Sequence, residues 1–274
     1  MREFKNKVAV VTGAASGIGK AIAERCAAEG MRVVLADIEA PALDAAARAM
    51  SGGIVMPYRI DVSEPSAVDA MAEAVYKEFG AVHLLFNNAG VASGGTPCWA
   101  QALDSWKWVI GVNFYGVLYG IRSFVPRMLA GGEEGRVVNT ASVAGLRSAA
   151  GMAPYCATKH AVVALSETLY LELKMAKSRV SASVLCPAFV KTRIGESERN
   201  RPGAGEAQSG SPEFAAMIRS LIETGVSPES IAEKVFDAIR ADQFWILTHP
   251  EFDAVLRGNA DAMLARRNPE PMPV

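Results

Sequence analysis

Cysteine is scarce in this sequence, and no spacing links the few that occur. Four cysteines stand among 274 residues, with no Cys-x-x-Cys pair and no histidine at metal-ligand spacing from any of them. This pattern argues against structural zinc, and a chain of this length shows no sign of a disulfide framework. We therefore expect no metal site, and we interpret the four residues as free thiols of a cytoplasmic protein.

Long apolar runs are also absent. No stretch reaches the roughly 20 uninterrupted apolar residues that a membrane span needs. The first seven residues, Met-Arg-Glu-Phe-Lys-Asn-Lys, lack the apolar core and the cleavage site of a signal peptide. The sequence therefore predicts a soluble protein with no membrane partner.

No charge of either sign is in excess. Lys and Arg number 28 against 29 Asp and Glu, which gives a formal net charge of −1 and no electrostatic footprint for a nucleic-acid partner. The chain is instead apolar, with 50% hydrophobic residues, which is enough to bury a sizeable core. Because no repeat, low-complexity block or linker interrupts it, we expect residues 1–274 to form a single domain.

Short apolar strands alternate with helical segments along the chain. Strands are predicted at 7–12, 32–36, 54–60, 82–86, 136–139, 180–185 and 244–247. Helices are predicted at 18–29, 41–50, 65–79, 103–130, 154–176 and 228–240. This alternation with short connections implies an α/β fold, a parallel sheet with helices on both faces. The polar residues 192–212 are too many for a plain connection, so we expect a substrate lid over about 192–224 and a flexible tail over about 266–274.

A glycine-rich turn lies between the first strand and the first helix. Gly13 permits a tight turn with positive φ, Gly17 lets the backbone approach a pyrophosphate, and Gly19 allows close packing of helix on strand. Ser16 and Ile18 lie between these glycines, where N–H groups at a helix start favour a negative charge. The spacing Gly-x-x-x-Gly-x-Gly, placed after a strand and before a helix, predicts a dinucleotide-binding site.

Acidic residues end the second and third predicted strands. A carboxylate at Asp37 can accept hydrogen bonds from both hydroxyls of the adenosine ribose and repel a 2′-phosphate, which favours NAD over NADP. No basic residue occurs at 14–18 or 37–39. Asp61 could accept from the adenine amino group, with Val62 packing nearby, or it could serve only as a helix-entry residue.

Tyr155 and Lys159 lie four residues apart on one helix, so both face the same side. A tyrosine pKa of about 10 is too high for a general base at neutral pH. A nearby ammonium favours the phenolate, so we expect Lys159 to lower the pKa of Tyr155 and Tyr155 to exchange a proton with an alcohol.

Two more polar residues lie near this pair. Ser142 follows the fifth predicted strand, at the sheet edge where ligands bind, and its hydroxyl can hold a substrate oxygen beside Tyr155. Asn113 falls within a predicted helix, where asparagine is a weak helix former. It could fix a water that relays protons from Lys159, or it could be a structural residue that bonds the backbone.

Taken together, these motifs resemble the short-chain dehydrogenase/reductase family over about residues 5–250. The resemblance is carried by Thr-Gly-x-x-x-Gly-x-Gly at 12–19, Asn-Asn-Ala-Gly at 87–90, Asn113, Ser142 and Tyr-x-x-x-Lys at 155–159. It implies one Rossmann-type domain with a seven-stranded parallel sheet and a catalytic tetrad of Asn113, Ser142, Tyr155 and Lys159.

The resemblance also implies cofactor contacts. Lys159 would bind the nicotinamide ribose in addition to its role beside Tyr155. Further contacts would come from Asn88, Ala89, Gly90, Pro187, Val190 and Thr192. Relatives carry glycine after the proline of the sixth strand, whereas this chain has Ala188, so we expect a local change of backbone geometry there.

The implied activity is hydride transfer between NAD(H) and a secondary alcohol or ketone. Apolar residues around the tetrad, among them Val143, Met152 and Phe189, favour a hydrophobic or aromatic substrate. Residues 243–250 resemble a subgroup that includes dehydrogenases of bulky aromatic alcohols. The alternatives are an NADP-dependent carbonyl reductase and a non-catalytic NAD(H)-sensing protein, and a dehydratase or epimerase is less favoured.

Two predicted helices, 103–130 and 154–176, are apolar on more than one face. On the second helix the apolar set is Val162, Val163, Leu165, Leu169 and Leu173. In similar proteins these two helices form a four-helix dimer interface, so we expect a homo-oligomer, either a tetramer or a dimer. We assign the three histidines, His83, His160 and His249, to packing or interface roles.

Overall fold

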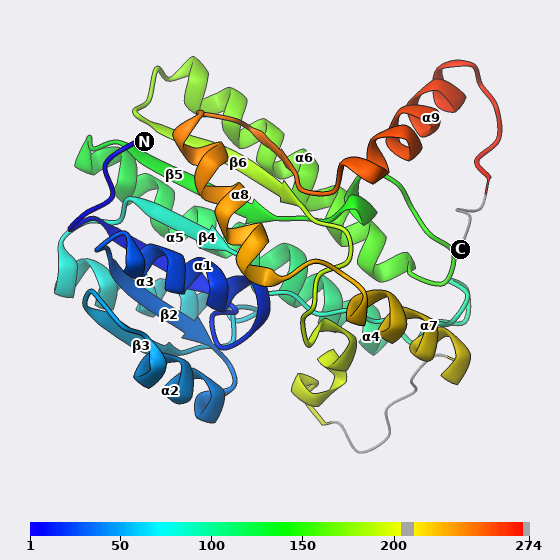
Figure 1. Ribbon diagram of the computed structural model, residues 1–274, viewed down its shortest axis with the longest axis horizontal. Helices are drawn as coiled ribbons and strands as arrows, with labels where there is room; N and C mark the ends of the chain where they lie inside the picture. The colour runs from blue at the N-terminus through cyan, green and yellow to red at the C-terminus, as the bar shows by residue number, and fades with distance from the viewer. Residues whose placement is uncertain (204–210, 271–274) are drawn as a thin grey trace.

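Seven parallel strands form a single sheet at the centre of the molecule (Figure 1). The computed structural model describes residues 1–203 and 211–270. The strands are β1 (Val8–Thr12), β2 (Arg32–Asp37), β3 (Val55–Arg59), β4 (Leu84–Asn87), β5 (Gly135–Thr140), β6 (Val180–Cys186) and β7 (Trp245–Leu247). Their order is β3-β2-β1-β4-β5-β6-β7. The predicted α/β fold with a seven-stranded parallel sheet is therefore confirmed.

Helices cover both faces of this sheet. One core cluster joins it to α1 (Gly17–Ala28), α2 (Ala40–Ala49) and α8 (Pro228–Arg240). The other cluster joins it to α3 (Pro65–Phe79), α5 (Gly116–Gly131) and α6 (Ala153–Met175). Strands β1, β4 and β5 are buried along their whole length, because apolar side chains are needed on both faces of a sheet covered in this way.

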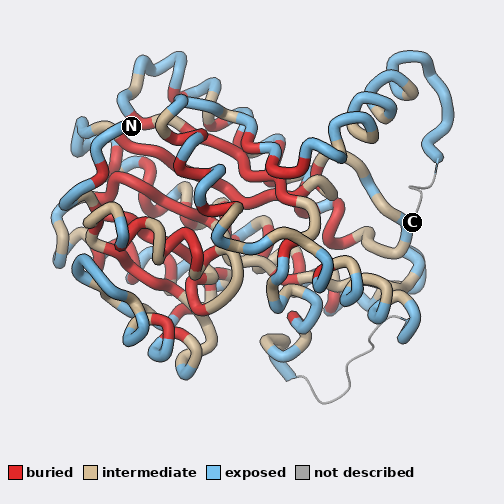
Figure 2. The backbone as a smooth tube through the Cα atoms, viewed as in Figure 1, coloured by how far each residue is buried: buried red, intermediate tan, exposed pale blue. Residues whose placement is uncertain are grey.

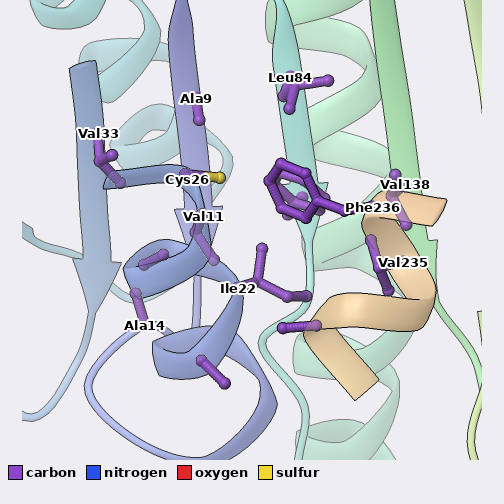
Figure 3. Packing of buried hydrophobic residues seen from close by; sticks show 14 of the residues in the cluster. Ala9, Val11, Ala14, Ile22, Cys26, Val33, Leu84, Val138, Val235 and Phe236 are labelled. Carbon is purple, nitrogen blue, oxygen red and sulfur yellow. The ribbon is translucent and has the colours of Figure 1, made fainter. Parts of the chain in front are cut away.

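Alternate side chains of the central strands point into the two core clusters on opposite faces of the sheet. Ala9 and Val11 point into the first cluster, where they meet Ile22 from α1 and Phe236 from α8 (Figure 3). Val10, between them, belongs to the second cluster. Pro57 is accommodated in β3 because that strand lies at the sheet edge and pairs only with β2.

The carboxyl ends of the strands meet at one edge of the sheet. The chain reverses its direction of growth between β1 and β4, and this switch point is where open α/β sheets bind ligands. Asp37, Asn87, Thr140 and Cys186 end four of the strands there. The fold thus gathers at one edge residues that are far apart along the chain.

The long helix expected at 103–130 is interrupted. It consists of α4 (Leu103–Ile110), a π-helical turn η1 (Gly111–Tyr115) and α5. By length and composition this run could cross a membrane, but α5 packs on the sheet and on α3. Gly120 permits the close approach, since a Cβ there would lie 2.1 Å from Asn87 Oδ1. The π turn is the part that sequence periodicity does not reveal.

The expected lid contains two helical segments. They are the 3₁₀ segment η3 (Ile194–Asn200) and α7 (Pro212–Glu223), which begins where the hydroxyl of Ser211 accepts from the N–H of Phe214. Residues 204–210 of the lid and 271–274 of the tail lie outside the described residues. A further helix, α9 (Asp253–Leu264), was not predicted. It stands away from the buried core with no buried residue of its own (Figure 2).

The apolar set on α6 is covered within the chain itself. Four of its five members are buried, namely Val162, Val163, Leu169 and Leu173. These side chains do not form a free surface, because η1, β6 and Phe244 cover more of α6 than a single stripe. Large apolar side chains do remain exposed elsewhere on these helices, at Leu103, Tyr115, Leu129, Leu171 and Met175.

Candidate active site

A cavity of about 280 Å³ opens at the carboxyl edge of the sheet. Of the residues proposed for the site, those that line it are Gly13, Ser16, Gly17, Ile18, Asp37, Asp61, Val62, Asn88, Ala89, Gly90, Ser142, Tyr155, Lys159, Pro187, Val190 and Thr192. Gly19 and Asn113 lie outside this lining. The tertiary structure therefore brings nearly all of the proposed residues to one place.

The glycine loop forms a cradle that side chains would fill. Gly13 and Gly17 both have positive φ, 66° and 54°. A Cβ on Gly19 would lie 2.1 Å from the carbonyl oxygen of Gly13 and 2.5 Å from Asn88 Nδ2. This loop leads into the N-terminus of α1, where unpaired N–H groups favour an anion. The arrangement fits the pyrophosphate of a dinucleotide.

Asp37 is fixed at the end of β2 by two backbone bonds. Its Oδ2 accepts from the N–H of Ala15 at 2.9 Å, and its Oδ1 accepts from the N–H of Glu39 at 3.0 Å. Each carboxylate oxygen has a further lone pair. Asp37 can therefore still accept from ribose hydroxyls while its position beside the glycine loop is held.

Asp61 has a local role in the structure. Its Oδ1 accepts from the N–H of Ser63 at 2.9 Å and from the Ser63 hydroxyl at 2.7 Å, just before α3 begins. This supports the helix-entry interpretation. The bonds use only Oδ1, and the residue lines the cavity together with Val62, so an adenine contact stays a proposal.

Three polar side chains meet at the deep end of the cavity. Ser142, Tyr155 and Lys159 are only 7%, 9% and 2% exposed. The Ser142 hydroxyl donates to the carbonyl of Pro187 at 3.1 Å and accepts from the N–H of Ala144. Lys159 Nζ donates to the carbonyl of Thr140 at 2.9 Å and lies 5.5 Å from the centre of the Tyr155 ring. A hydroxyl, a phenol and an amine therefore converge without any carboxylate partner among the bonds of the described residues.

Burial is the largest influence on the pKa values of Tyr155 and Lys159. It raises the pKa of Tyr155 to about 12, against a smaller lowering by the Ser142 hydroxyl. It lowers the pKa of Lys159 to about 8, against a smaller opposing effect of Cys186. Burial thus sets the pKa of Tyr155 in the protein without its cofactor, and the expected lowering of this pKa by Lys159 stays a prediction for the protein with its cofactor bound.

Asn113 is held by the loop that follows β4. Its Oδ1 accepts from the N–H of Val91 at 2.8 Å, and its Nδ2 donates to the Val91 carbonyl at 2.9 Å and to Thr158 Oγ1 at 3.2 Å. These bonds support the structural interpretation. The π-helical turn presents the side chain toward this loop, and a Cβ on Gly90 would lie 3.5 Å from Asn113 Oδ1 and 3.4 Å from Lys159 Nζ.

Comparison with known proteins decides the family. The model of the short chain dehydrogenase family matches residues 7–203. A crystal structure of a short-chain dehydrogenase/reductase from Burkholderia phymatum in complex with NAD is 43% identical, with 100% of each chain covered and a TM-score of 0.96. The chain belongs to the short-chain dehydrogenase family.

Two similar proteins are also named as dehydrogenases. A CLA biosynthesis dehydrogenase/reductase of Lactiplantibacillus plantarum is 32% identical over 98% of this chain and 97% of its own. Meso-2,3-butanediol dehydrogenase of Serratia marcescens is 40% identical over 70% of this chain and 74% of its own. The chain is an oxidoreductase acting on CH–OH groups, as the sequence motifs predict.

Ala188 fits the dehydrogenase backbone without strain. Positive φ occurs at four non-glycine positions among the described residues, and Ala188 is not one of them. Its N–H donates to His249 Nδ1 at 3.1 Å, while His249 Nε2 pairs with the Phe189 carbonyl at 3.1 Å. Alanine at this position therefore needs no left-handed backbone, and His249 braces the loop after β6. No local pattern around His249 indicates this contact.

Sequence reasoning missed part of the cavity wall in the dehydrogenase. The missed lining residues are Trp108 on α4, Phe252 just before α9, and Val255 and Leu256 on α9, whereas Arg199 and Ile218 lie within the expected lid. The helical spacing of apolar residues at 255, 256, 260, 263 and 264 is the one signal that indicates α9. Val143, Met152 and Phe189, together with Ile218, Phe252, Val255 and Leu256, make this part of the lining mostly apolar. Arg147, whose guanidinium donates to the Glu270 carbonyl at 2.7 Å, also lines the cavity.

Proposed function

We propose that this dehydrogenase uses NAD to oxidise secondary alcohols with an apolar body, or to reduce the corresponding ketones. The observation that carries the proposal is the cavity itself, which joins the glycine cradle and Asp37 at one end to Ser142, Tyr155 and Lys159 at the other. When bound, NAD supplies the acceptor for the hydride that leaves the alcohol carbon.

The residues of the chain would handle the proton and the position of the substrate. The Ser142 hydroxyl can exchange its bond to the Pro187 carbonyl for one to the substrate oxygen. The Tyr155 phenolate then takes the alcohol proton as the hydride leaves, and in the reverse direction the Tyr155 hydroxyl gives a proton to the oxygen that forms. Lys159, buried beside the Tyr155 ring, would bring a positive charge that favours the phenolate once the site is closed to water.

The cofactor proposal rests on the fit of the chain's own residues. The carboxylate oxygens of Asp37 accept hydrogen bonds, which suits ribose hydroxyls and opposes a 2′-phosphate. The Burkholderia phymatum relative was crystallised with NAD. Gly13, Gly17 and the N-terminus of α1 would hold the pyrophosphate.

The test is a turnover assay with NAD and with NADP over aliphatic, steroid-like and aromatic secondary alcohols. We expect NADH formation from at least one apolar class, and its loss in Tyr155→Phe. Binding of NADH without turnover of any alcohol or ketone would instead favour a cofactor-sensing protein. Turnover with NADP alone would favour a carbonyl reductase.

We further propose that the enzyme is a cytoplasmic homo-oligomer, a tetramer or a dimer. The support is the set of large apolar side chains that stays exposed on α4, η1, α5 and α6, including Leu103, Tyr115 and Met175. All four cysteines are free, three of them buried, which suits a reducing compartment. Sedimentation of the purified protein at micromolar concentration tests the assembly, and a monomer would contradict it.

A further inference from the structure

The segment of residues 193–201 crosses the cavity and is held on both sides. On one side Arg199 and Asn200 bond to Glu39, two residues beyond the end of β2. In the middle, the buried Ser197 hydroxyl accepts from the N–H of Ala92 at 3.1 Å. On the other side Arg201 donates to Ser105 Oγ at 2.8 Å. The segment therefore covers the end of the cavity where Asp37 lies.

The Glu39 carboxylate binds most of the polar side chains at this end of the 193–201 segment. One oxygen, Oε1, accepts from Arg199 Nη2 at 2.7 Å, from Arg199 Nε at 3.0 Å and from Asn200 Nδ2 at 3.1 Å. The other oxygen lies 3.6 Å from Arg193 Nη1. The hydrogen bond from Arg199 is the main reason that the pKa of Glu39 lies below its usual range. Glu39 is thus ionised at neutral pH and holds Arg199.

The two arginines differ in how strongly they depend on Glu39. Arg199 has no other acidic partner among the described residues, and its remaining nitrogen donates to the carbonyls of Arg193 and Glu196, both at 2.9 Å. Arg193 also pairs with Glu196, at 3.1 Å. Neutralising Glu39 would therefore free Nε and Nη2 of Arg199 for another anion but leave Arg193 with an acidic partner.

A released Arg199 would change the charge at the ribose end. Arg199, Glu39 and Asp37 all line the same cavity, and the N–H of Glu39 bonds directly to Asp37. Guanidinium groups bind phosphates through paired hydrogen bonds, so a free Arg199 there would favour the 2′-phosphate that distinguishes NADP from NAD.

We propose that Glu39 is a second determinant of cofactor preference, because it occupies Arg199 and so withholds this cation from a 2′-phosphate. The proposal rests on the proposed NAD-dependent function. It assigns to Glu39 a role separate from that of Asp37, which opposes the phosphate directly. Substitution of the Glu39 side chain keeps the backbone bond to Asp37, so the two roles can be separated by experiment.

The experiment measures dissociation constants of NAD and NADP for purified variants. In Glu39→Gln we expect the affinity for NADP relative to NAD to rise about tenfold, the scale of a hydrogen bond between a guanidinium and an anion. Glu39→Gln combined with Arg199→Gln should return the ratio to that of the wild type. The matched control, Glu39→Gln with Arg193→Gln, should keep the increase.

The outcomes separate the proposal from its competitors. If Glu39 only fixes the 193–201 segment, its substitution weakens both cofactors equally and the ratio stays constant, which overturns the proposal. An equal rise with and without Arg199 overturns it as well. Glu39→Ala provides a second test of the same ratio, with thermal unfolding to verify the fold. A wild-type protein that binds neither cofactor would refute the proposed function instead.

Discussion

Two parts of the cavity are held in place in different ways: the buried wall, formed by Ser142, Tyr155 and Lys159, and the second wall, formed by the 193–201 segment. Ser142 follows β5, Tyr155 and Lys159 lie on α6, and all three lie within 18 residues of one another and are buried at the sheet edge. The 193–201 segment is held by contacts that join residues up to 161 positions apart, and the Arg193 side chain is 47% exposed. Exposed ion pairs contribute about 0–1 kcal/mol each, whereas buried packing is far stronger. On the proposed function, we expect the chemical step to depend on the first wall and the retention of the cofactor on the second.

The largest effect should come from removing the proton-transfer group of the buried wall. Tyr155→Phe keeps the ring but has no hydroxyl, so we expect kcat to fall about a thousandfold, within the range of general acid–base catalysis. Steady-state kinetics with the best alcohol measures this, and Tyr58→Phe on β3 is the control. If Tyr155→Phe retained most of its activity, the buried wall would not be the catalytic one.

Glycine at position 19 should be needed for the fold of the cofactor end. Gly19→Ala places a Cβ against the Gly13 carbonyl, which we expect to lower the free energy of unfolding by about 3 kcal/mol, the upper end of the overpacking range. Gly258→Ala in α9 meets nothing within 4 Å and should be neutral or slightly stabilising. Chemical denaturation compares the two, and equal stabilities would contradict the close packing of α1 on the glycine loop.

The buried amine predicts a pH dependence of stability. Burial lowers the pKa of Lys159 to about 8, so between this value and the ordinary lysine value of 10.5 the unfolded state binds more protons than the folded state. Lys159 therefore makes the free energy of unfolding rise with pH, by up to about 1.4 kcal/mol per pH unit. We expect the difference between wild type and Lys159→Met to show this slope between pH 8 and 9.5. A difference that is constant with pH would mean that Lys159 is well solvated.

The smallest effect should come from a substitution in the 193–201 segment. Ser197→Ala removes the partner of the Ala92 N–H, so we expect about 1 kcal/mol less stability and faster release of NAD. Ser220→Ala, at an exposed position of α7, is the matched control. Stopped-flow release of the cofactor measures the effect. If Ser197→Ala slowed the chemical step instead, the division between the two walls would fail.

Much of this site could be predicted because its signals are local. The glycine loop, Asp37 and the Tyr155–Lys159 pair each sit at a strand end or on one helix face, where periodicity fixes their direction. The π-helical turn around Asn113 and the brace from His249 could not be predicted in this way. Their geometry depends on which loop packs against them, and the partners, Val91 and Ala188, are far away in sequence.

The alternating apolar segments by themselves determined the fold class, because burial in a covered parallel sheet repeats along the chain. The motifs at 12–19, 87–90 and 155–159 carried the resemblance to the family. Residues 14–18 and 37–39 include no basic residue, so the sequence alone predicts no cation at the ribose end of the cavity. Only the tertiary structure brings Arg199 to Glu39, across 160 positions. Such contacts follow from the path of a loop over the sheet edge, which no local spacing encodes.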